Sequence, residues 1–502
     1  MKNAKKLLWT TLLLTASSFV MKTVGVWFNT YLTARIQTAG IGLWSLVLSV
    51  YLMAKTLAGA GMGLVTTRLV IDEPEGVDAN LKNLYRTALI PSVTAMTVLY
   101  LAAPYLAWHM IGDSQSLWAL RVLSFSLPFI GMSTVTGGYS TAKRKMARYA
   151  LIQMCEQAVH IGVSIWALGL VSSHDRGQAT LAAALGITAG EIFSFVCGLL
   201  CVLYDRRHQR CGKQTGHFWK KIGAIALPDG AGSVFRSLLS TVQNLLIPKG
   251  MKQHGASDTQ ALEAYGAVHG LALPVLLYPS SILGVLSGLL VPEIAQSKAE
   301  NKIGHVHYIL YRVLHLAGIF SVAVCGAMLG FGKELSLAVY GNTDAAAYIT
   351  MLAPLIPIMY MDMTSDGLLK GLGLQKHIMT INVLDSIASV VLIYFLVPAM
   401  GIYGYVVMIY VTEILNFLLS FSCLIRHSRF PLSRLSRLWL VLVLMGCAIL
   451  VSRALCPWLP TGSAAGECAV MIAVSTGFFL LLCLATGVLS REDLSWFKKT
   501  VQ

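Results

Sequence analysis

Long apolar stretches separated by short polar intervals run almost from one end of the chain to the other. A helix needs roughly 20 apolar residues to cross a bilayer, and about fourteen stretches reach that length. The predicted spans are 7–31, 40–67, 84–109, 117–140, 149–171, 179–204, 222–248, 264–291, 306–331, 346–369, 377–397, 402–425, 438–456 and 468–489. The predicted fold class is therefore all-α, a polytopic membrane protein with about 14 transmembrane helices.

Composition narrows the possible activities. Hydrophobic residues make up 56% of the chain and charged residues 12%, and no polar interval is long enough to fold as a separate soluble domain. A P-loop motif is absent from the sequence, so ATP hydrolysis is not expected. The 10 cysteines form no C-x-x-C pair, which argues against a metal or redox site. We expect a protein that is not an enzyme and that needs no cofactor.

Lysine and arginine gather in every second interval between the predicted spans. The interval at 143–148 and the long interval at 205–221 are strongly basic, whereas the intervals next to them are nearly uncharged. Because cations near span ends are retained in the cytoplasm, this alternation predicts that both termini lie there. The net charge of +15 is then a consequence of topology, and no nucleic-acid partner is expected.

The chain carries a weak internal repeat. The sequence A-G-I-G-L-W at 39–44 precedes the second span, and A-Y-G-A-V-H-G at 264–270 begins the eighth. Parallel repeats of this kind build transporters from two similar halves. We predict six-helix lobes at 1–213 and 214–430, with two appended helices and a cytoplasmic tail at 431–502. Pro274 and Pro279 should kink the eighth span, and Pro354 and Pro357 the tenth.

Four cations fall inside predicted spans: Lys22, Lys55, Arg121 and Arg236. A charge at mid-bilayer costs roughly 3 kcal/mol or more unless it is paired or hydrated. Arg121 lies near a span end, where its side chain reaches the interface. The other three lie deeper, so each either contacts a polar substrate or pairs with an intramembrane carboxylate. Lys55 fits these two explanations equally well.

Acidic residues also occur inside the spans. Glu191 and Glu413 lie near the middle of the sixth and twelfth spans, and Asp362 lies in the tenth. A partly desolvated carboxylate binds a proton or sodium ion readily, so these residues are candidates for ion coupling. Hydrogen bonding between helices, or pairing with a lysine, is the alternative that we favour.

Several motifs resemble a known family. They are YGAVHGLALPVLLYPSSILGVLSGLLVPEIA at 265–295, K-x-x-G at 22–25, A-R at 34–35, N-L at 244–245 followed by I-P-K at 247–249, and L-K-G-L-G-L-Q-K at 369–376. Over residues 7 to 425 the chain resembles the stage V sporulation protein B family. That family belongs to the polysaccharide and lipid II flippase branch of the multidrug, oligosaccharidyl-lipid and polysaccharide exporter superfamily.

The resemblance implies a flippase in a bacterial plasma membrane, with a cationic cavity between its lobes. Such proteins move an undecaprenyl-pyrophosphate-linked glycan, lipid II or a related polysaccharide precursor, from the inner to the outer leaflet by alternating access. Spore cortex peptidoglycan is the implied pathway, membrane lipids surround the protein, and cell-wall synthesis proteins are possible partners. The residues expected to bind pyrophosphate are Lys22, Arg236, Lys55 and Arg35, and those expected to line the cavity are Asn29, Asn244, Tyr265 and His269.

Two other functions remain open at this point. A cation-coupled multidrug exporter of the same superfamily would favour an acidic, aromatic cavity. A non-transporting membrane scaffold for envelope assembly would have a closed, fully packed bundle. Substrate charge separates the first from a flippase, and a solvated cationic site argues against the second.

Overall fold

The computed structural model describes residues 2–72, 77–171, 175–206, 218–429, 431, 438–455 and 464–490. These residues are almost entirely helical and contain no strand, which confirms the predicted all-α class. The chain forms two compact units, Met1–Gly266 and Ala267–Gln502. The lobe boundary predicted at 213/214 and the tail after residue 490 lie outside the described residues. The three-part division of the chain stays a prediction.

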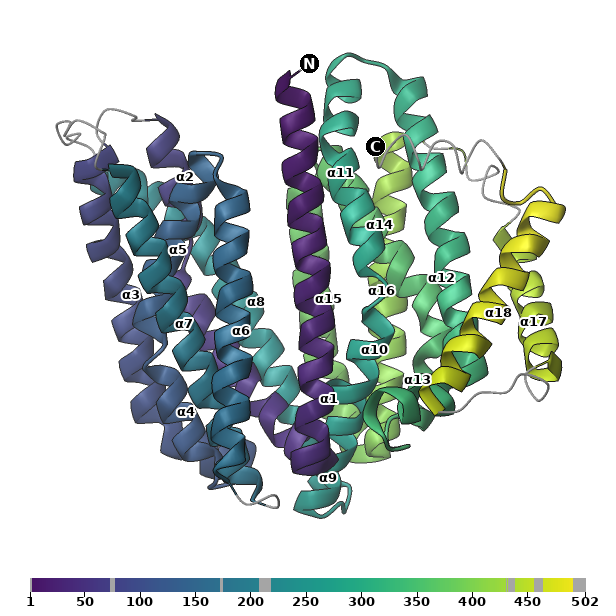
Figure 1. Ribbon diagram of the computed structural model, residues 1–502, viewed down its shortest axis with the longest axis horizontal. Coiled ribbons are helices and arrows are strands. Elements are labelled where there is room, and N and C mark those ends of the chain that lie inside the picture. The colour runs from purple at the N-terminus through teal and green to yellow at the C-terminus, as the bar shows by residue number, and fades with distance from the viewer. Residues whose placement is uncertain are drawn as a thin grey trace. The chain divides into compact units, whose positions relative to one another are not determined.

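The first unit is built from long helices that Figure 1 labels along the chain. In chain order they are α1 (Lys2–Gly59), α2 (Met62–Asp72), α3 (Val77–Tyr105), the π-helical η1 (Leu106–Ile111), α4 (Ser116–Ser124), α5 (Leu127–Ala142), α6 (Met146–Gly169), α7 (Arg176–Arg206), α8 (Phe218–Gln253) and α9 (Asp258–Tyr265).

Helix α1 contains a sharp turn. Its 58 residues would extend about 87 Å if straight, far more than one crossing of a bilayer needs. Gln37 has a non-helical backbone, with φ 59° and ψ 176°, and Figure 1 shows the chain turning within α1. The span predicted at 7–31 therefore lies on the first arm of α1, and the span predicted at 40–67 runs from the second arm into α2; a kink, with no loop, joins the two arms. Gly61, at φ 72°, separates α1 from α2.

Two glycines let α1 and α9 approach closely. A Cβ atom added at Gly42 would overlap the carbonyl oxygen of Leu262. A Cβ atom added at Gly266 would overlap the carbonyl oxygen of Thr38. The two backbones are therefore in direct contact, a mode of packing that small residues permit in membrane proteins.

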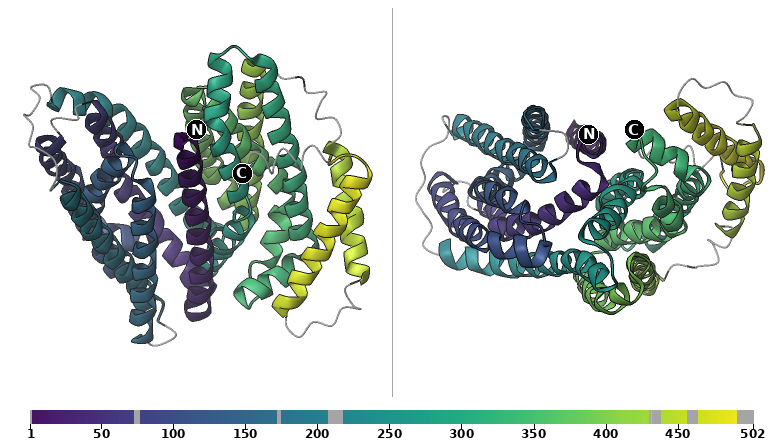
Figure 2. Two further views of the ribbon diagram at one scale, coloured as in Figure 1. Left: turned by 45° about the horizontal axis from the view of Figure 1, so that its top comes forward. Right: turned by 90° about the horizontal axis from the view of Figure 1, so that it is seen from below.

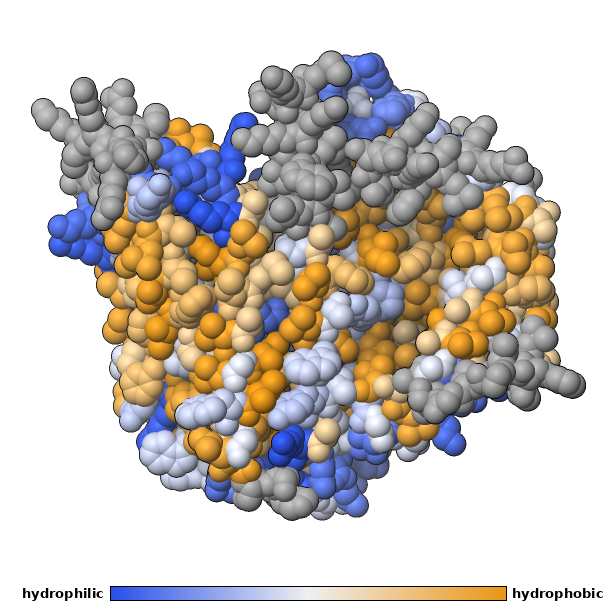
Figure 3. All heavy atoms as spheres, viewed as in Figure 1, coloured by the Kyte–Doolittle hydropathy of each residue, from blue (hydrophilic) through white to orange (hydrophobic). Residues whose placement is uncertain are grey.

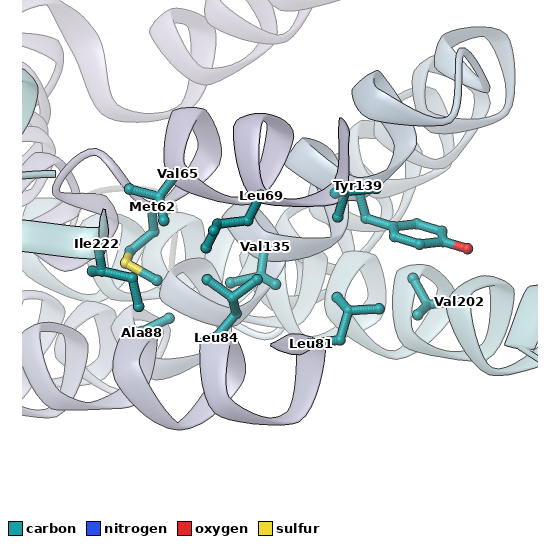
Figure 4. Close-up of a cluster of buried hydrophobic side chains, with 11 residues drawn as sticks. Met62, Val65, Leu69, Leu81, Leu84, Ala88, Val135, Tyr139, Val202 and Ile222 are labelled. Atoms are coloured by element: carbon teal, nitrogen blue, oxygen red, sulfur yellow. The ribbon is translucent and has the colours of Figure 1, made fainter. Parts of the chain in front are cut away.

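The apolar interior of the first unit is shown in Figure 4. Leu69 of α2, Leu81 of α3, Val135 of α5, Val202 of α7 and Ile222 of α8 pack into one buried cluster. These residues come from five helices, so the cluster holds the first unit together through van der Waals contact.

The second unit continues the helical architecture. Its helices are the π-helical η2 (Gly266–Ala272), which begins at the last residue of the first unit, α10 (Leu273–Leu277), α11 (Ser281–Ala299), α12 (Ile303–Tyr340), α13 (Ala346–Leu352), the 3-10 helix η3 (Ala353–Leu355), α14 (Ile356–Gly371), α15 (Gln375–Met400), α16 (Ile402–Ser428), α17 (Leu438–Leu455) and α18 (Ala464–Ala485).

The prolines interrupt the spans where predicted. Pro279 lies in the break between α10 and α11, where the helix axis bends by 50°. Pro354 lies in η3, the 3-10 turn between α13 and α14, and Pro357 begins the first turn of α14. The kink expected in the eighth span is confirmed at Pro279, whereas Pro274 lies in the first turn of α10; the tenth span is interrupted by a 3-10 turn at Pro354.

The last two helices pack on α12. Figures 1 and 2 show α17 and α18 side by side at the C-terminal end of the colour scale. Ile319 of α12, Val441 of α17 and Phe479 of α18 belong to one buried apolar cluster. The appended pair is therefore an integral part of the second unit.

The helix surfaces are those of a membrane protein. Large apolar side chains such as Leu101, Trp166 and Leu450 are 67–72% exposed, and Figure 3 shows hydrophobic side chains predominating along the helices, with hydrophilic ones gathered toward their ends. Among the described residues, nine helices are long and apolar enough to span a membrane, or up to eleven if each bent pair counts as one span. One of them, Ala16–Asp72, contains both arms of α1 together with α2. The chain is thus a multi-pass membrane protein, while the count of about fourteen spans stays a prediction.

Candidate functional site

The four predicted pyrophosphate-binding residues all belong to the first unit. Lys22 and Arg35 lie on the first arm of α1, Lys55 lies on the second arm, and Arg236 lies on α8. The side chains of Lys22, Arg35 and Arg236 are exposed, and that of Lys55 is half-buried. Arg35 lies 5.8 Å from the ring centroid of Tyr31, one turn earlier on α1, in a cation–π contact.

Polar side chains fasten α8 to the second arm of α1. The Asn244 amide donates to the Ser49 hydroxyl at 3.0 Å, and the Thr241 hydroxyl donates to the Ser49 carbonyl at 3.0 Å. Asn244 is buried, so its amide serves the contact between these two helices. Its predicted role of lining a cavity stays a prediction.

Two of the cations are next in sequence to another contact in this interface. The Thr56 hydroxyl donates to the Ser237 hydroxyl at 3.3 Å. Lys55 precedes Thr56 on α1, and Arg236 precedes Ser237 on α8. Each cationic residue is therefore one residue away from the contact between α1 and α8.

A second interface joins the first arm of α1 to α6. The Gln157 amide donates to the Met21 carbonyl at 2.8 Å, next to Lys22. Two turns further along α1, the ring of Phe28 meets the ring of His160 edge-on, with centroids 5.3 Å apart. Because Gln157 and His160 are one turn apart, a single face of α6 holds the segment of α1 that carries Lys22. Asn29, next to Phe28, is half-buried.

Lys55 forms an ion pair inside the first unit. Its ammonium donates to a carboxylate oxygen of Glu191 on α7 at 2.5 Å. The sequence left substrate contact and pairing with a carboxylate equally open for Lys55, and ion coupling or pairing with a lysine open for Glu191; the structure pairs these two residues. A second carboxylate, Glu156 on α6, interacts electrostatically with both of them.

Arg121 has a different environment from these cations. Its guanidinium lies 5.0 Å from the ring centroid of Tyr100 and 5.2 Å from that of Trp118. Aromatic rings stabilise a cation through their electron-rich faces. This contact provides a structural reason for Arg121 that involves no substrate.

The two remaining predicted cavity residues lie on either side of the boundary between the units. Tyr265 is fully buried at the end of α9. His269 lies in η2, and its Nδ1 atom is 3.4 Å from the Tyr405 hydroxyl of α16. The two residues are close in sequence, and the contact of His269 with Tyr405 lies within the second unit.

Intramembrane acids gather in the second unit. Asp362 of α14 accepts a hydrogen bond from the Asn416 amide of α16 at 3.1 Å. Glu413, one turn before Asn416, interacts electrostatically with Asp362 and with Asp385 of α15. Two predicted ion-coupling residues therefore share one acidic cluster, whereas Glu191 lies in the first unit. Among the residues that the structure describes, no group of three or more His, Cys, Asp or Glu is arranged to hold a metal ion.

The helix contacts made by Gln157, Thr56 and Ser237 are absent from the sequence predictions. Each is a polar residue inside an apolar span, where a side-chain hydrogen bond to another helix is expected. The sequence therefore indicates that such a residue bonds to another helix, but it does not show which residue is the partner.

The chain matches a known protein family. Residues 7–298 match the model of the family described as polysaccharide biosynthesis protein. Stage V sporulation protein B of Bacillus subtilis (strain 168) is 26% identical over 515 aligned residues, which cover 96% of each chain. Sporulation protein YkvU of the same organism is 18% identical, covering 77% of this chain and 87% of its own.

Solved structures share the fold. The lipid II flippase MurJ in an inward closed conformation has a TM-score of 0.69 at 13% identity, covering 93% of this chain and 97% of that chain. An inward-facing multidrug resistance MATE family transporter of the MOP superfamily has a TM-score of 0.61 at 14% identity, covering 84% and 94%. At these identities the likeness establishes the architecture.

Proposed function

This chain belongs to the polysaccharide biosynthesis protein family, and we propose that it is a flippase for a lipid-linked glycan. The substrate is an undecaprenyl-pyrophosphate-linked glycan, lipid II or a related polysaccharide precursor, carried from the inner to the outer leaflet by alternating access. The relation to stage V sporulation protein B and the fold shared with lipid II flippase MurJ support this substrate class. We also propose a role in spore cortex peptidoglycan synthesis; the name of the first relative, a sporulation protein, supports a role in sporulation.

One observation carries the proposal: two cations deep in the spans lie next to the contact between the packed helices α1 and α8. Lys55 and Arg236 each precede a residue of the Thr56–Ser237 hydrogen bond, and neither side chain is fully buried. A pyrophosphate accepts charge-assisted hydrogen bonds from lysine and arginine. An anion at this place also offsets the cost of keeping the cations within the bilayer, roughly 3 kcal/mol or more for each.

Each predicted residue has a role in the proposal. Arg236 binds two phosphate oxygens through its planar fork, and Lys22 and Lys55 act as point charges. Arg35 attracts the headgroup at the outer end of the first arm of α1. The residues that we propose to line the path of the sugar are Asn29, Asn244, Tyr265 and His269, of which Asn244 and Tyr265 are buried in this conformation.

Ion coupling is the part of the proposal that involves the second unit. Asp362 and Glu413 repel each other when both are ionised, so a proton or sodium ion that binds there relieves the repulsion. Glu191 is the corresponding candidate in the first unit. Binding of the ion to one conformation in preference to the other would drive the cycle.

We also propose a location and partners for the protein. The protein resides in the plasma membrane of a bacterial cell with both termini in the cytoplasm, and it moves its substrate without chemical change. Membrane lipids hold the polyprenyl tail, and cell-wall synthesis proteins supply and use the glycan.

Reconstitution tests this function directly. The purified full-length protein is placed in vesicles that contain labelled lipid II, and a membrane-impermeant enzyme reports the lipid II on the accessible leaflet. Vesicles with protein should expose the protected pool within minutes, whereas protein-free vesicles should retain it. Vesicles that move a cationic drug along an ion gradient and leave lipid II in place would identify a multidrug exporter. Vesicles that move neither substrate would identify a scaffold.

A further inference from the structure

We propose that Glu191 competes with the substrate for Lys55. In the empty carrier its carboxylate holds the Lys55 ammonium, and it gives up the ammonium when an anionic headgroup binds. This inference rests on the proposed function, because it assumes that the anion reaches Lys55. It assigns Glu191 a positioning role: it sets how tightly the substrate is held.

The ion pair is strongly asymmetric in exposure. The Lys55 side chain is 40% exposed, whereas that of Glu191 is 8% exposed, and their charged atoms are 2.5 Å apart. The Lys55 side chain is therefore open to a second anion while its ammonium is bound to Glu191. The carboxylate is enclosed, so Lys55 is the partner that can change its contacts.

Helix packing holds the carboxylate in place. A Cβ atom at Gly190, the residue before Glu191, would lie 3.0 Å from the Glu156 carbonyl oxygen of α6. One turn earlier, a Cβ atom at Gly186 would lie 2.5 Å from the His160 carbonyl oxygen. The two glycines bring α6 and α7 into backbone contact at this level. Lysine has a flexible four-carbon stem, so the mobile member of the pair is Lys55.

The local charge favours an exchangeable pair. One ammonium, that of Lys55, interacts with two carboxylates, those of Glu191 and Glu156. His160, Tyr51 and Tyr149 also lie within electrostatic range of this group. Lys55 is thus already neutralised before substrate arrives. A pyrophosphate gains this cation only by displacing Glu191, which lowers the affinity of the site for the anion.

Lower affinity benefits the transport cycle at two steps. After the glycan leaves, Lys55 would be an unpaired charge in the span, and pairing with Glu191 removes that cost while the carrier returns empty. When the substrate is released, Glu191 competes with the headgroup for Lys55, and re-formation of the Lys55–Glu191 pair speeds dissociation of the headgroup. A carrier without Glu191 would bind its substrate more tightly and turn over more slowly.

The test measures affinity and turnover separately. Binding of inorganic pyrophosphate to the purified full-length protein is measured by calorimetry for wild type, Glu191→Gln, Glu156→Gln and Lys55→Gln. Glu191→Gln should bind about tenfold more tightly, since one competing ionic contact is removed. Glu156→Gln removes the same charge from the same cluster without breaking the pair, so its affinity should stay within about threefold of wild type. Glu191→Gln should also flip lipid II more slowly over many turnovers.

The outcomes separate this inference from the proposed function. If Glu191→Gln binds pyrophosphate no more tightly than wild type, the competition is refuted, whatever the flipping assay shows. If affinity rises as expected but the wild-type protein flips no lipid II, the competition stands and the substrate assignment fails. Glu191→Asp, which withdraws the carboxylate by one methylene, should give an intermediate affinity and replaces Glu191→Gln if that variant does not fold.

Discussion

The hydroxyl of Thr56 donates a hydrogen bond to the hydroxyl of Ser237 at 3.3 Å, across 181 residues of sequence. Lys55 and Arg236 are the residues immediately before this contact on α1 and α8. Both helices belong to the first unit, so their packing brings these two positions near one helix contact. Two cations near one helix contact suit an anionic ligand such as a pyrophosphate.

Substitution of Arg236 should separate the effect of its charge on transport from the effect of its bidentate hydrogen-bonding geometry. Arg236→Lys keeps the positive charge but loses the bidentate fork, so the flipping rate should fall about tenfold. Arg236→Gln loses both the charge and the fork, so its flipping rate should fall further. The initial rate of lipid II exposure in vesicles measures both variants. Equal rates for the two variants would mean that the charge of Arg236 has no part in transport.

Gly42→Ala should disrupt the crossing of α1 and α9. The added methyl group overlaps the Leu262 carbonyl oxygen, and backbone atoms cannot move aside as a flexible side chain can. We expect a loss of roughly 2 kcal/mol or more in the free energy of unfolding, as in overpacked cores. Gly162→Ala on α6 is the control, because nothing lies within 4 Å of its added Cβ atom. The free energy of unfolding in detergent is measured for both variants. Equal stability of the two would contradict the close approach of α1 and α9.

Asp205→Asn should weaken the end of α7. The Asp205 carboxylate accepts from Lys145 at 2.7 Å and from Arg148 at 2.6 Å, and its side chain is buried. Replacing the Asp205 carboxylate leaves the charges of Lys145 and Arg148 uncompensated. The free energy of unfolding should fall by about 2 kcal/mol, because both cations remain partly hydrated. The exposed pair of Glu300 with Lys302 is the control, and Glu300→Gln should leave the unfolding midpoint unchanged. A larger shift for Glu300→Gln than for Asp205→Asn would reverse this ranking.

Hydropathy predicted the helical regions well because each span must be apolar along most of its length. The predicted span 377–397 falls within α15, and 402–425 falls within α16. The continuity of α1 was missed, since polar residues such as Arg35 and Gln37 imitate a loop between two spans. Helix direction can reverse at a single residue in the left-handed region, and hydropathy does not report backbone dihedral angles.

The candidate site was predictable only as a set of residue types. A mid-span lysine requires a compensating partner, and the sequence offered substrate or carboxylate for Lys55 without ranking them. Glu191 lies 136 residues away, so its pairing with Lys55 depends on which helices are neighbours. Hydrophobic periodicity gives the apolar face of each helix but does not give the order of helices in a bundle. For the same reason the partners of Gln157 and Ser237 appear only in the structure.

The most direct test of the central claim compares three span cations in one vesicle assay. The double variant Lys22→Gln/Arg236→Gln removes two proposed pyrophosphate contacts, whereas Arg121→Gln removes a cation that two aromatic rings hold. The account predicts that the double variant inserts into the membrane normally and exposes no lipid II on the outer leaflet, while Arg121→Gln retains the wild-type rate. Wild-type flipping by the double variant would contradict it.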